Sequence, residues 1–164
     1  MKLLFIFVGI IGCSVIIPII TFKIITFSIN TDSDKNIDFE SLSKGYYGDY
    51  NEHNYFIINT PIVWEQVWNS TFSSQSTIPV INFTTNTIIA VYLGGRVTGG
   101  YHIIITRVGE TPTNYNVYVT ESSPSSTFTG ELTPALSAPY HIIKTQKLTK
   151  NVSFVVTEYF YSSS

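Results

Sequence analysis

The stretch Gly94–Ile103, which reads GGRVTGGYHI, constrains the fold of this chain most. It separates two apolar runs, Thr87–Leu93 and Tyr101–Val108, whose β-branched and aromatic residues are typical of β-strands. Glycine is required where φ is positive or where another backbone approaches closely. The four glycines therefore predict a sharply bent loop of defined shape between two strands.

A second stretch, Thr133–Ile142, ends in the same tripeptide as the first, Tyr-His-Ile. In both stretches the tripeptide follows residues that interrupt regular structure, glycines in the first and prolines in the second. We therefore expect two loops, 94–101 and 122–140, and predict that together they form the functional end of the domain.

The composition favours β-structure and argues against a nucleic-acid partner. Thr, Ser, Asn, Ile and Tyr are abundant, whereas the helix-favouring residues Ala, Leu, Glu and Lys are scarce. The net charge is −2 and the nine cations are scattered singly, so no basic patch is present to neutralise phosphates. The single cysteine, Cys13, allows no disulfide framework, so stability must come from packing.

Residues 1–23 predict a membrane segment. Leu3–Phe22 is an uncharged, apolar run, long enough as a helix to cross the hydrocarbon core of a bilayer. Three interpretations stay open: a transmembrane signal-anchor, a cleaved signal peptide, or a lipoprotein signal in which Cys13 is the lipid anchor. All three place the rest of the chain outside the cytoplasm, on the cell surface or the periplasmic side of the membrane.

After this segment, residues 24–38 predict a tether and residues 39–161 a globular domain. Thr60 and Pro61 suit the N-cap and first position of a helix. The residues that follow form an apolar stripe at helical spacing, which we expect to pack on a sheet: Trp64, Val67, Trp68 and Phe72.

The remaining apolar runs are short and alternate with polar turns, which is typical of β-strands. The predicted strands are Tyr46–Tyr50, Asn54–Asn59, Asn86–Leu93, Tyr101–Val108, Tyr115–Glu121, Pro139–Thr145 and Val152–Tyr161. Because strands do not alternate with helices, the predicted fold is mainly β: an antiparallel β-sandwich or barrel-like sheet with one short docked helix.

Two stretches resemble a known family. Asn86–Ile103 is similar to the strand followed by Gly-x-Arg/Lys-Pro-Thr-Gly-Gly-Tyr that marks the PrcB C-terminal domain family, with Val97 where that family usually has proline. Thr133–Lys144 resembles the second signature of the family, and the helix around Glu65 resembles its upstream Glu-Glu-Trp segment. The resemblance implies an envelope-associated domain that associates with a surface protease complex and stabilises it.

A weaker likeness suggests a different function. The run from Thr98 to Tyr101, Thr-Gly-Gly-Tyr, is similar to the Thr-Gly-Tyr/Phe loop of chagasin-type cysteine-protease inhibitors, with one additional glycine. This likeness implies an inhibitor that uses loops 94–101 and 122–140 as a wedge. A structural or adhesive surface domain is the third hypothesis.

The sequence predicts neither catalysis nor a cofactor. It contains no nucleophile elbow, and its acidic residues show no spacing that pairs two of them as an acid and a base. The spacing of His53, His102 and His141 matches no metal motif, so we expect hydrogen-bonded structural histidines and no metal site.

Arg96 is the leading candidate for contact with a partner protein, because an arginine among glycines has no local side-chain partner and can bind a carboxylate. The alternative role of Arg96, a bracing hydrogen bond to carbonyls of the second loop, stays open. We expect Tyr101 and Tyr140 to be half-buried anchors of the two loops. The complete set of predicted partner-binding residues is Arg96, Thr98, Gly99, Gly100, Tyr101, Pro139, Tyr140 and His141.

Three Asn-x-Ser/Thr sequons are candidate glycosylation sites, at Asn69, Asn82 and Asn151. Taken together, the sequence predicts a membrane-tethered, extracytoplasmic, non-catalytic domain that binds a protein and no nucleic acid, with a surface protease or its complex as the expected partner.

Overall fold

The computed structural model describes residues 34–72, 76–132 and 134–162, all within the compact unit Asp32–Ser164. The expected membrane segment 1–23, including Cys13, and most of the expected tether lie outside the described residues. Among the residues that are described, no helix is long and apolar enough to span a membrane.

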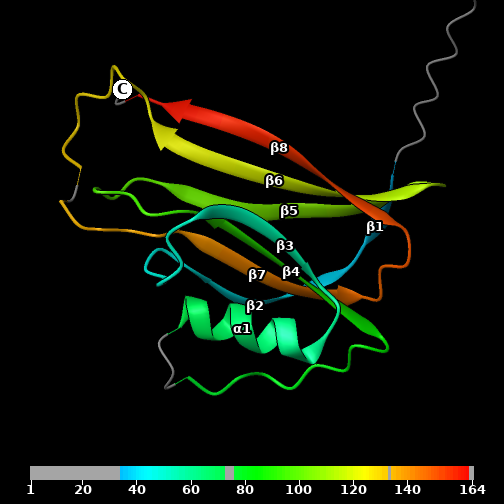
Figure 1. Ribbon diagram of the computed structural model, residues 1–164. Helices are drawn as coiled ribbons and strands as arrows, with labels where there is room; N and C mark the ends of the chain where they lie inside the picture. The colour runs from blue at the N-terminus through cyan, green and yellow to red at the C-terminus, as the bar shows by residue number, and fades with distance from the viewer. Residues whose placement is uncertain (1–33, 73–75, 133, 163–164) are drawn as a thin grey trace, which may run out of the picture. The chain divides into compact units, whose positions relative to one another are not determined.

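The described chain forms two four-stranded sheets and one helix (Figure 1). Sheet A has the strand order β1-β5-β6-β8 and sheet B the order β2-β7-β4-β3. The elements are β1 Lys35–Ile37, β2 Phe39–Gly45, β3 His53–Ile58, α1 Pro61–Thr71, β4 Asn86–Leu93, β5 His102–Glu110, β6 Asn114–Pro124, β7 Tyr140–Gln146 and β8 Asn151–Tyr161. Neither sheet closes on itself, so the sandwich, and not the barrel-like sheet, describes the fold.

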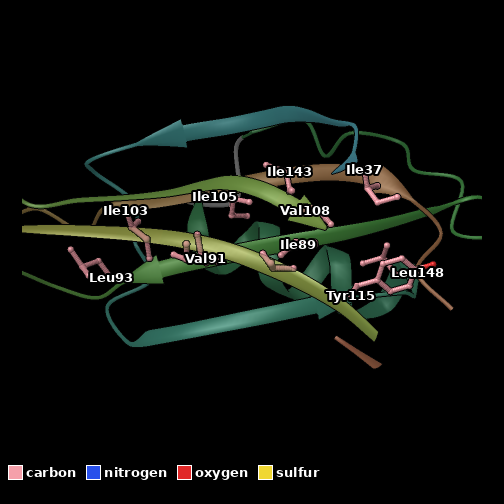
Figure 2. Close-up of a cluster of buried hydrophobic side chains, with 12 residues drawn as sticks. Ile37, Ile89, Val91, Leu93, Ile103, Ile105, Val108, Tyr115, Ile143 and Leu148 are labelled. Carbon is pink, nitrogen blue, oxygen red and sulfur yellow. The ribbon is translucent and has the colours of Figure 1, made fainter. Parts of the chain in front are cut away.

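The main core lies between the two sheets (Figure 2). From β4 of sheet B, Ile89, Val91 and Leu93 point toward the side chains that β5 and β6 of sheet A contribute. Along β6 every second residue is buried, from Tyr115 to Glu121, which confirms the alternation predicted for this strand. Burial of these apolar side chains supplies the main force that holds the sheets together.

A second core joins the other face of sheet B to helix α1. Trp64, Val67 and Trp68 are buried against the side chains of β4 and β7 that point away from sheet A, which confirms the predicted docking of the helix. Both indole N–H groups donate hydrogen bonds, Trp64 to the carbonyl of Pro79 (2.9 Å) and Trp68 to the hydroxyl of Ser76 (2.8 Å). Strand β4 is thus covered on both faces, which explains its uninterrupted apolar sequence.

The N-terminus of α1 is capped as the sequence predicts, because the side chain of Thr60 accepts a hydrogen bond from the N–H of Val63. We expect Thr60→Ala to lower the free energy of unfolding by about 1 kcal/mol, and Thr60→Ser to lower it far less. Urea unfolding followed by tryptophan fluorescence measures both. Equal losses for the two variants would contradict a capping role for the hydroxyl.

Three features differ from the sequence prediction. Lys35–Ile37, inside the expected tether, form β1 and pair with β5. The strand expected at Tyr46–Tyr50 lies earlier, at Phe39–Gly45, where charged and polar residues on a partly exposed edge conceal the apolar pattern. Strand β8 pairs with β6 in parallel, because the chain crosses through β7 of sheet B between these two strands. The sheets are therefore mostly, but not wholly, antiparallel.

Candidate functional site

Two crossovers between the sheets pair with each other at one end of the sandwich, at the left of Figure 1. Residues 94–101 lead from β4 to β5, and residues 125–139 lead from β6 to β7. The N–H of Arg96 donates to the carbonyl of Ser137 (2.7 Å), and the N–H of Ser137 donates back to the carbonyl of Arg96 (2.9 Å). The Ser137 hydroxyl donates to the carbonyl of Thr98 (2.9 Å). We call residues 94–101 and 134–139 the paired loops.

Glycines fix the first of the paired loops at both ends. Gly94 and Gly100 have positive φ angles of 81° and 90°, a region that other residues rarely adopt. The N–H of Gly95 donates to the carbonyl of Asn51 (2.9 Å), and the carbonyl of Gly100 accepts a hydrogen bond from the Tyr161 hydroxyl. The loop is therefore held by the chain before β3 and by the end of β8.

The Arg96 side chain turns back onto its own loop. Its guanidinium donates to the carbonyl of Gly95 (3.0 Å) and lies 5.4 Å from the centre of the Tyr101 ring. The guanidinium thus bonds to its own loop and not to carbonyls of the second loop, which the Arg96 backbone contacts instead. The side chain stays partly exposed, at the edge of two surface hollows.

The two predicted anchors differ in burial. Tyr101 is half-buried against the core between the sheets, as expected. Tyr140 is buried in the helix-side core, where its hydroxyl bonds with that of Ser43 (3.1 Å). Pro139 and His141 are also buried. The side chains of residues 139–141 therefore support the paired loops from beneath and are not placed to touch a partner.

The outer surface of this end is apolar. Tyr47, Val97 and Leu136 are 74%, 79% and 79% exposed, and all three line one hollow of about 250 Å³ together with Arg96 and Ser137. Tyr46 lines a neighbouring hollow of about 290 Å³, where its ring packs edge-on against His102. We call Tyr46, Tyr47, Val97 and Leu136 the apolar tip.

Val97 and Leu136 lie in the two loops predicted from the sequence but are not among the predicted site residues, and Tyr46 and Tyr47 lie outside both loops. The sequence pattern predicts a strand at Tyr46 and Tyr47, but the flanking Gly45 and Gly48 mark them as part of a bend. Both glycines lie close to the Tyr140 ring: a Cβ atom on either one would come within 2.9 Å of an atom of that side chain. The dipeptide Tyr46-Tyr47 is thus carried on a segment that packs closely over Tyr140.

A buried carboxylate lies beside the paired loops. Glu121 of β6 accepts hydrogen bonds from the Tyr55 hydroxyl and from Nε2 of His53 (2.8 Å). Burial, and then the hydrogen bond to Glu121, raise the pKa of Tyr55, which keeps it a donor. Each of these three side chains is bonded to the other two, which suits a structural network. Among the described residues, no group of three or more His, Cys, Asp or Glu side chains is arranged to hold a metal ion.

The sequon asparagines are all exposed, on three different elements. Asn69 lies on α1, Asn82 in the turn before β4 and Asn151 at the start of β8. In the first sequon the threonine, Thr71, is buried and bonded to the Tyr92 hydroxyl (2.6 Å).

Two face-to-face sheets with a helix on one outer face and a loop-built apolar end define an open β-sandwich domain. Residues 87–146 match the model of the PrcB C-terminal family, which confirms over this segment the family recognised from the sequence. The matched segment runs from β4 to β7 and so contains both paired loops, whereas α1 and β8 lie outside it. No curated protein and no solved structure matches the chain.

Proposed function

We propose that this domain binds a protein through the apolar tip and does no chemistry itself. The observation that carries the proposal is the grouping of Tyr47, Val97 and Leu136, each about three-quarters exposed, around one hollow. Exposed apolar side chains that gather on a soluble domain commonly mark an interaction site. The paired loops that carry two of them are fixed by hydrogen bonds and glycines, so binding orders little additional backbone.

We further propose that the partner is a protease complex of the cell envelope, which the bound domain stabilises. The PrcB C-terminal match over residues 87–146 supports this choice, because the matched segment supplies the paired loops. The apolar run Leu3–Phe22 supports a membrane tether and a position outside the cytoplasm.

Substitutions at the tip test the site. We expect Val97→Asp combined with Leu136→Asp to weaken binding of the partner at least about tenfold, because two charges must be desolvated at the interface. Ile62→Asp is the matched control: this side chain is 71% exposed, but it lies at the start of α1, away from the paired loops. The control should bind as the natural chain does.

The partner is identified by placing a photo-crosslinking amino acid at position 97, 136 or 62 of the full-length chain in the envelope of the source organism. A protein crosslinked from positions 97 and 136, but not from 62, is the partner, and affinity for it is then measured with the purified variants. Equal affinity of the tip variant and the Ile62→Asp control would remove the tip from the proposal and favour a structural or adhesive domain.

A protease inhibitor is the second candidate, because Val97 and Leu136 project from adjacent loops that a hydrogen-bonded bridge holds together. Such an inhibitor inserts its loops into the active-site cleft. Inhibition of a purified papain-like protease by the natural chain, lost in the tip variant, would replace a stabilising role by an inhibitory one.

A further inference from the structure

Strand β8 is the longest unpaired edge in the described part of the sandwich. It contains eleven residues and forms one edge of sheet A, at the top of Figure 1, with β6 as its only neighbouring strand. An edge strand offers a row of unpaired N–H and C=O groups to any other extended chain. Natural sheets usually protect such edges with lysine, proline, bulges or short strands.

Strands β1 and β2 have such protection and β3 is shorter than β8, whereas β8 has one inward-facing charge, Glu158, but no lysine, proline or bulge. Strand β1 has three residues and begins with Lys35. Strand β2 carries Lys44 and a register shift, and β3 has six residues with polar His53 and Asn54 exposed at its start. The sequence of β8, NVSFVVTEYFY, contains no lysine, arginine or proline, and its register with β6 is unbroken.

Several exposed side chains of β8 are large and apolar. Val155, Val156, Tyr159 and Phe160 are all exposed, the last two by 58% and 68%. Val156 pairs with Val119 and Glu158 with Glu121, residues that face the core, so these positions of β8 continue the inward face of sheet A. An added strand would extend this apolar face.

The β8 edge carries one negative charge, the carboxylate of Glu158. Glu158 is exposed and makes no hydrogen bond or ion pair with the residues that the structure describes. It lines a hollow of about 270 Å³ with the buried carboxylate of Glu121, the imidazole of His53, the Arg96 side chain and the ring of Phe160. The Arg96 guanidinium bonds to its own loop and Glu121 already has two donors, so Glu158 is the charge left to recognise a ligand.

We propose that β8 is a second protein-binding site, which adds an extended segment of a partner protein as a further strand of sheet A. The segment has apolar side chains beside Phe154 and Val156 and a lysine or arginine beside Glu158. Because side chains on one face of a strand recur every second residue, the segment reads apolar-x-apolar-x-Lys/Arg when parallel to β8, and the reverse when antiparallel. This site does not depend on the function proposed for the apolar tip.

Synthetic peptides test the site on the full-length chain. The probes are fluorescein-labelled Thr-Val-Thr-Val-Thr-Lys-Thr and the reversed sequence, each compared with a peptide that has glutamate in place of lysine. We expect at least one lysine peptide to bind by fluorescence anisotropy, about fivefold more tightly than its glutamate counterpart. Glu158→Lys should reverse that preference, whereas Glu65→Lys, on the exposed surface of α1, should not.

Hydrogen exchange distinguishes strand addition from simple charge attraction. Added backbone bonds should slow exchange of β8 amides when the lysine peptide is bound, and exchange in α1 should not change. Failure of both lysine peptides to bind, or binding without protection of β8, would overturn the proposal. Protection of β8 in a dimer of the chain without peptide, seen by analytical ultracentrifugation, would overturn it in favour of a second copy as the occupant.

Discussion

Gly94→Ala is expected to lower the free energy of unfolding by about 3 kcal/mol, more than most single substitutions do. At a φ of 81° an L-residue with a side chain is strained by roughly 1–2 kcal/mol. In addition, a Cβ atom at this position would lie 2.9 Å from the N atom of His53 and 3.0 Å from the carbonyl O of Asn51. Both are backbone atoms, so neither can move aside without displacing the start of β3.

Gly95→Ala is the matched control, because it adds the same methyl group one residue further along. Gly95 is exposed and does not have a positive φ, and a Cβ atom there meets the side-chain oxygen of Asn51 at 3.0 Å, which can rotate away. We expect a loss below about 1 kcal/mol. Urea unfolding followed by tryptophan fluorescence compares the two variants. Equal losses would show that the backbone at Gly94 adapts, and that its conformation is not required.

Local patterns in the sequence predicted the elements that depend on local physics. Thr60-Pro61 located the start of the helix, because capping involves only residues next to one another. The apolar run of β4 and the alternation of β6 were recognisable because one strand is buried on both faces and the other on one. The glycines of loop 94–101 marked a tight connection, and Gly94 and Gly100 have the positive φ angles that this requires.

The composition of the candidate site was less predictable, because it depends on which segments meet after folding. Tyr46 and Tyr47 are far from residues 94–139 in sequence. They lie beside the paired loops because the bend that carries them follows β2. The burial of Tyr101 and of Tyr140 also depends on the face of the sheet to which each side chain points. Tyr140 points to the helix-side core of sheet B, whereas Tyr101 lies at the start of sheet A.

The two Tyr-His-Ile tripeptides also show that identical local sequences can have different environments, which the sequence does not predict. His102 is exposed at the start of β5, against the ring of Tyr46. His141 is buried on β7 and faces sheet A, where its Nδ1 accepts a hydrogen bond from the backbone N–H of Ile105 (3.0 Å). Strand β1 pairs with Val108–Glu110, so among the described residues β5 has no neighbouring strand on that side at Ile105. His141 thus supplies an acceptor that no strand provides.

This role requires a neutral imidazole. Nδ1 must be unprotonated to accept from Ile105, and Nε2 lies 3.0 Å from the Ser41 hydroxyl. Burial, and secondarily the positive charge of Lys44, lower the pKa of His141 from 6.5 to about 4. The unfolded chain therefore binds a proton at His141 below about pH 6.5, while the folded chain does not until about pH 4. The stabilisation is complete above pH 6.5 and is lost as the pH falls from 6.5 to 4.

We expect the natural chain to lose roughly 2–3 kcal/mol of stability from this residue between about pH 7.5 and about pH 4.5. His141→Asn removes the titration but keeps an oxygen near the position of Nδ1, so its stability should fall less over this range. His141→Leu should lower stability by about 2–3 kcal/mol at neutral pH, because the N–H of Ile105 then lacks an acceptor.

Urea unfolding of the three chains at a series of pH values separates these effects. A hydrogen bond to Tyr118 lowers the pKa of Asp34, and one to Lys150 lowers the pKa of Glu110. Both carboxyl groups are present in all three chains, so their contribution cancels in the differences. Parallel stability curves for the natural chain and His141→Asn would show that another group causes the pH dependence. A difference that opens below about pH 6.5 would assign that part of the pH dependence to His141.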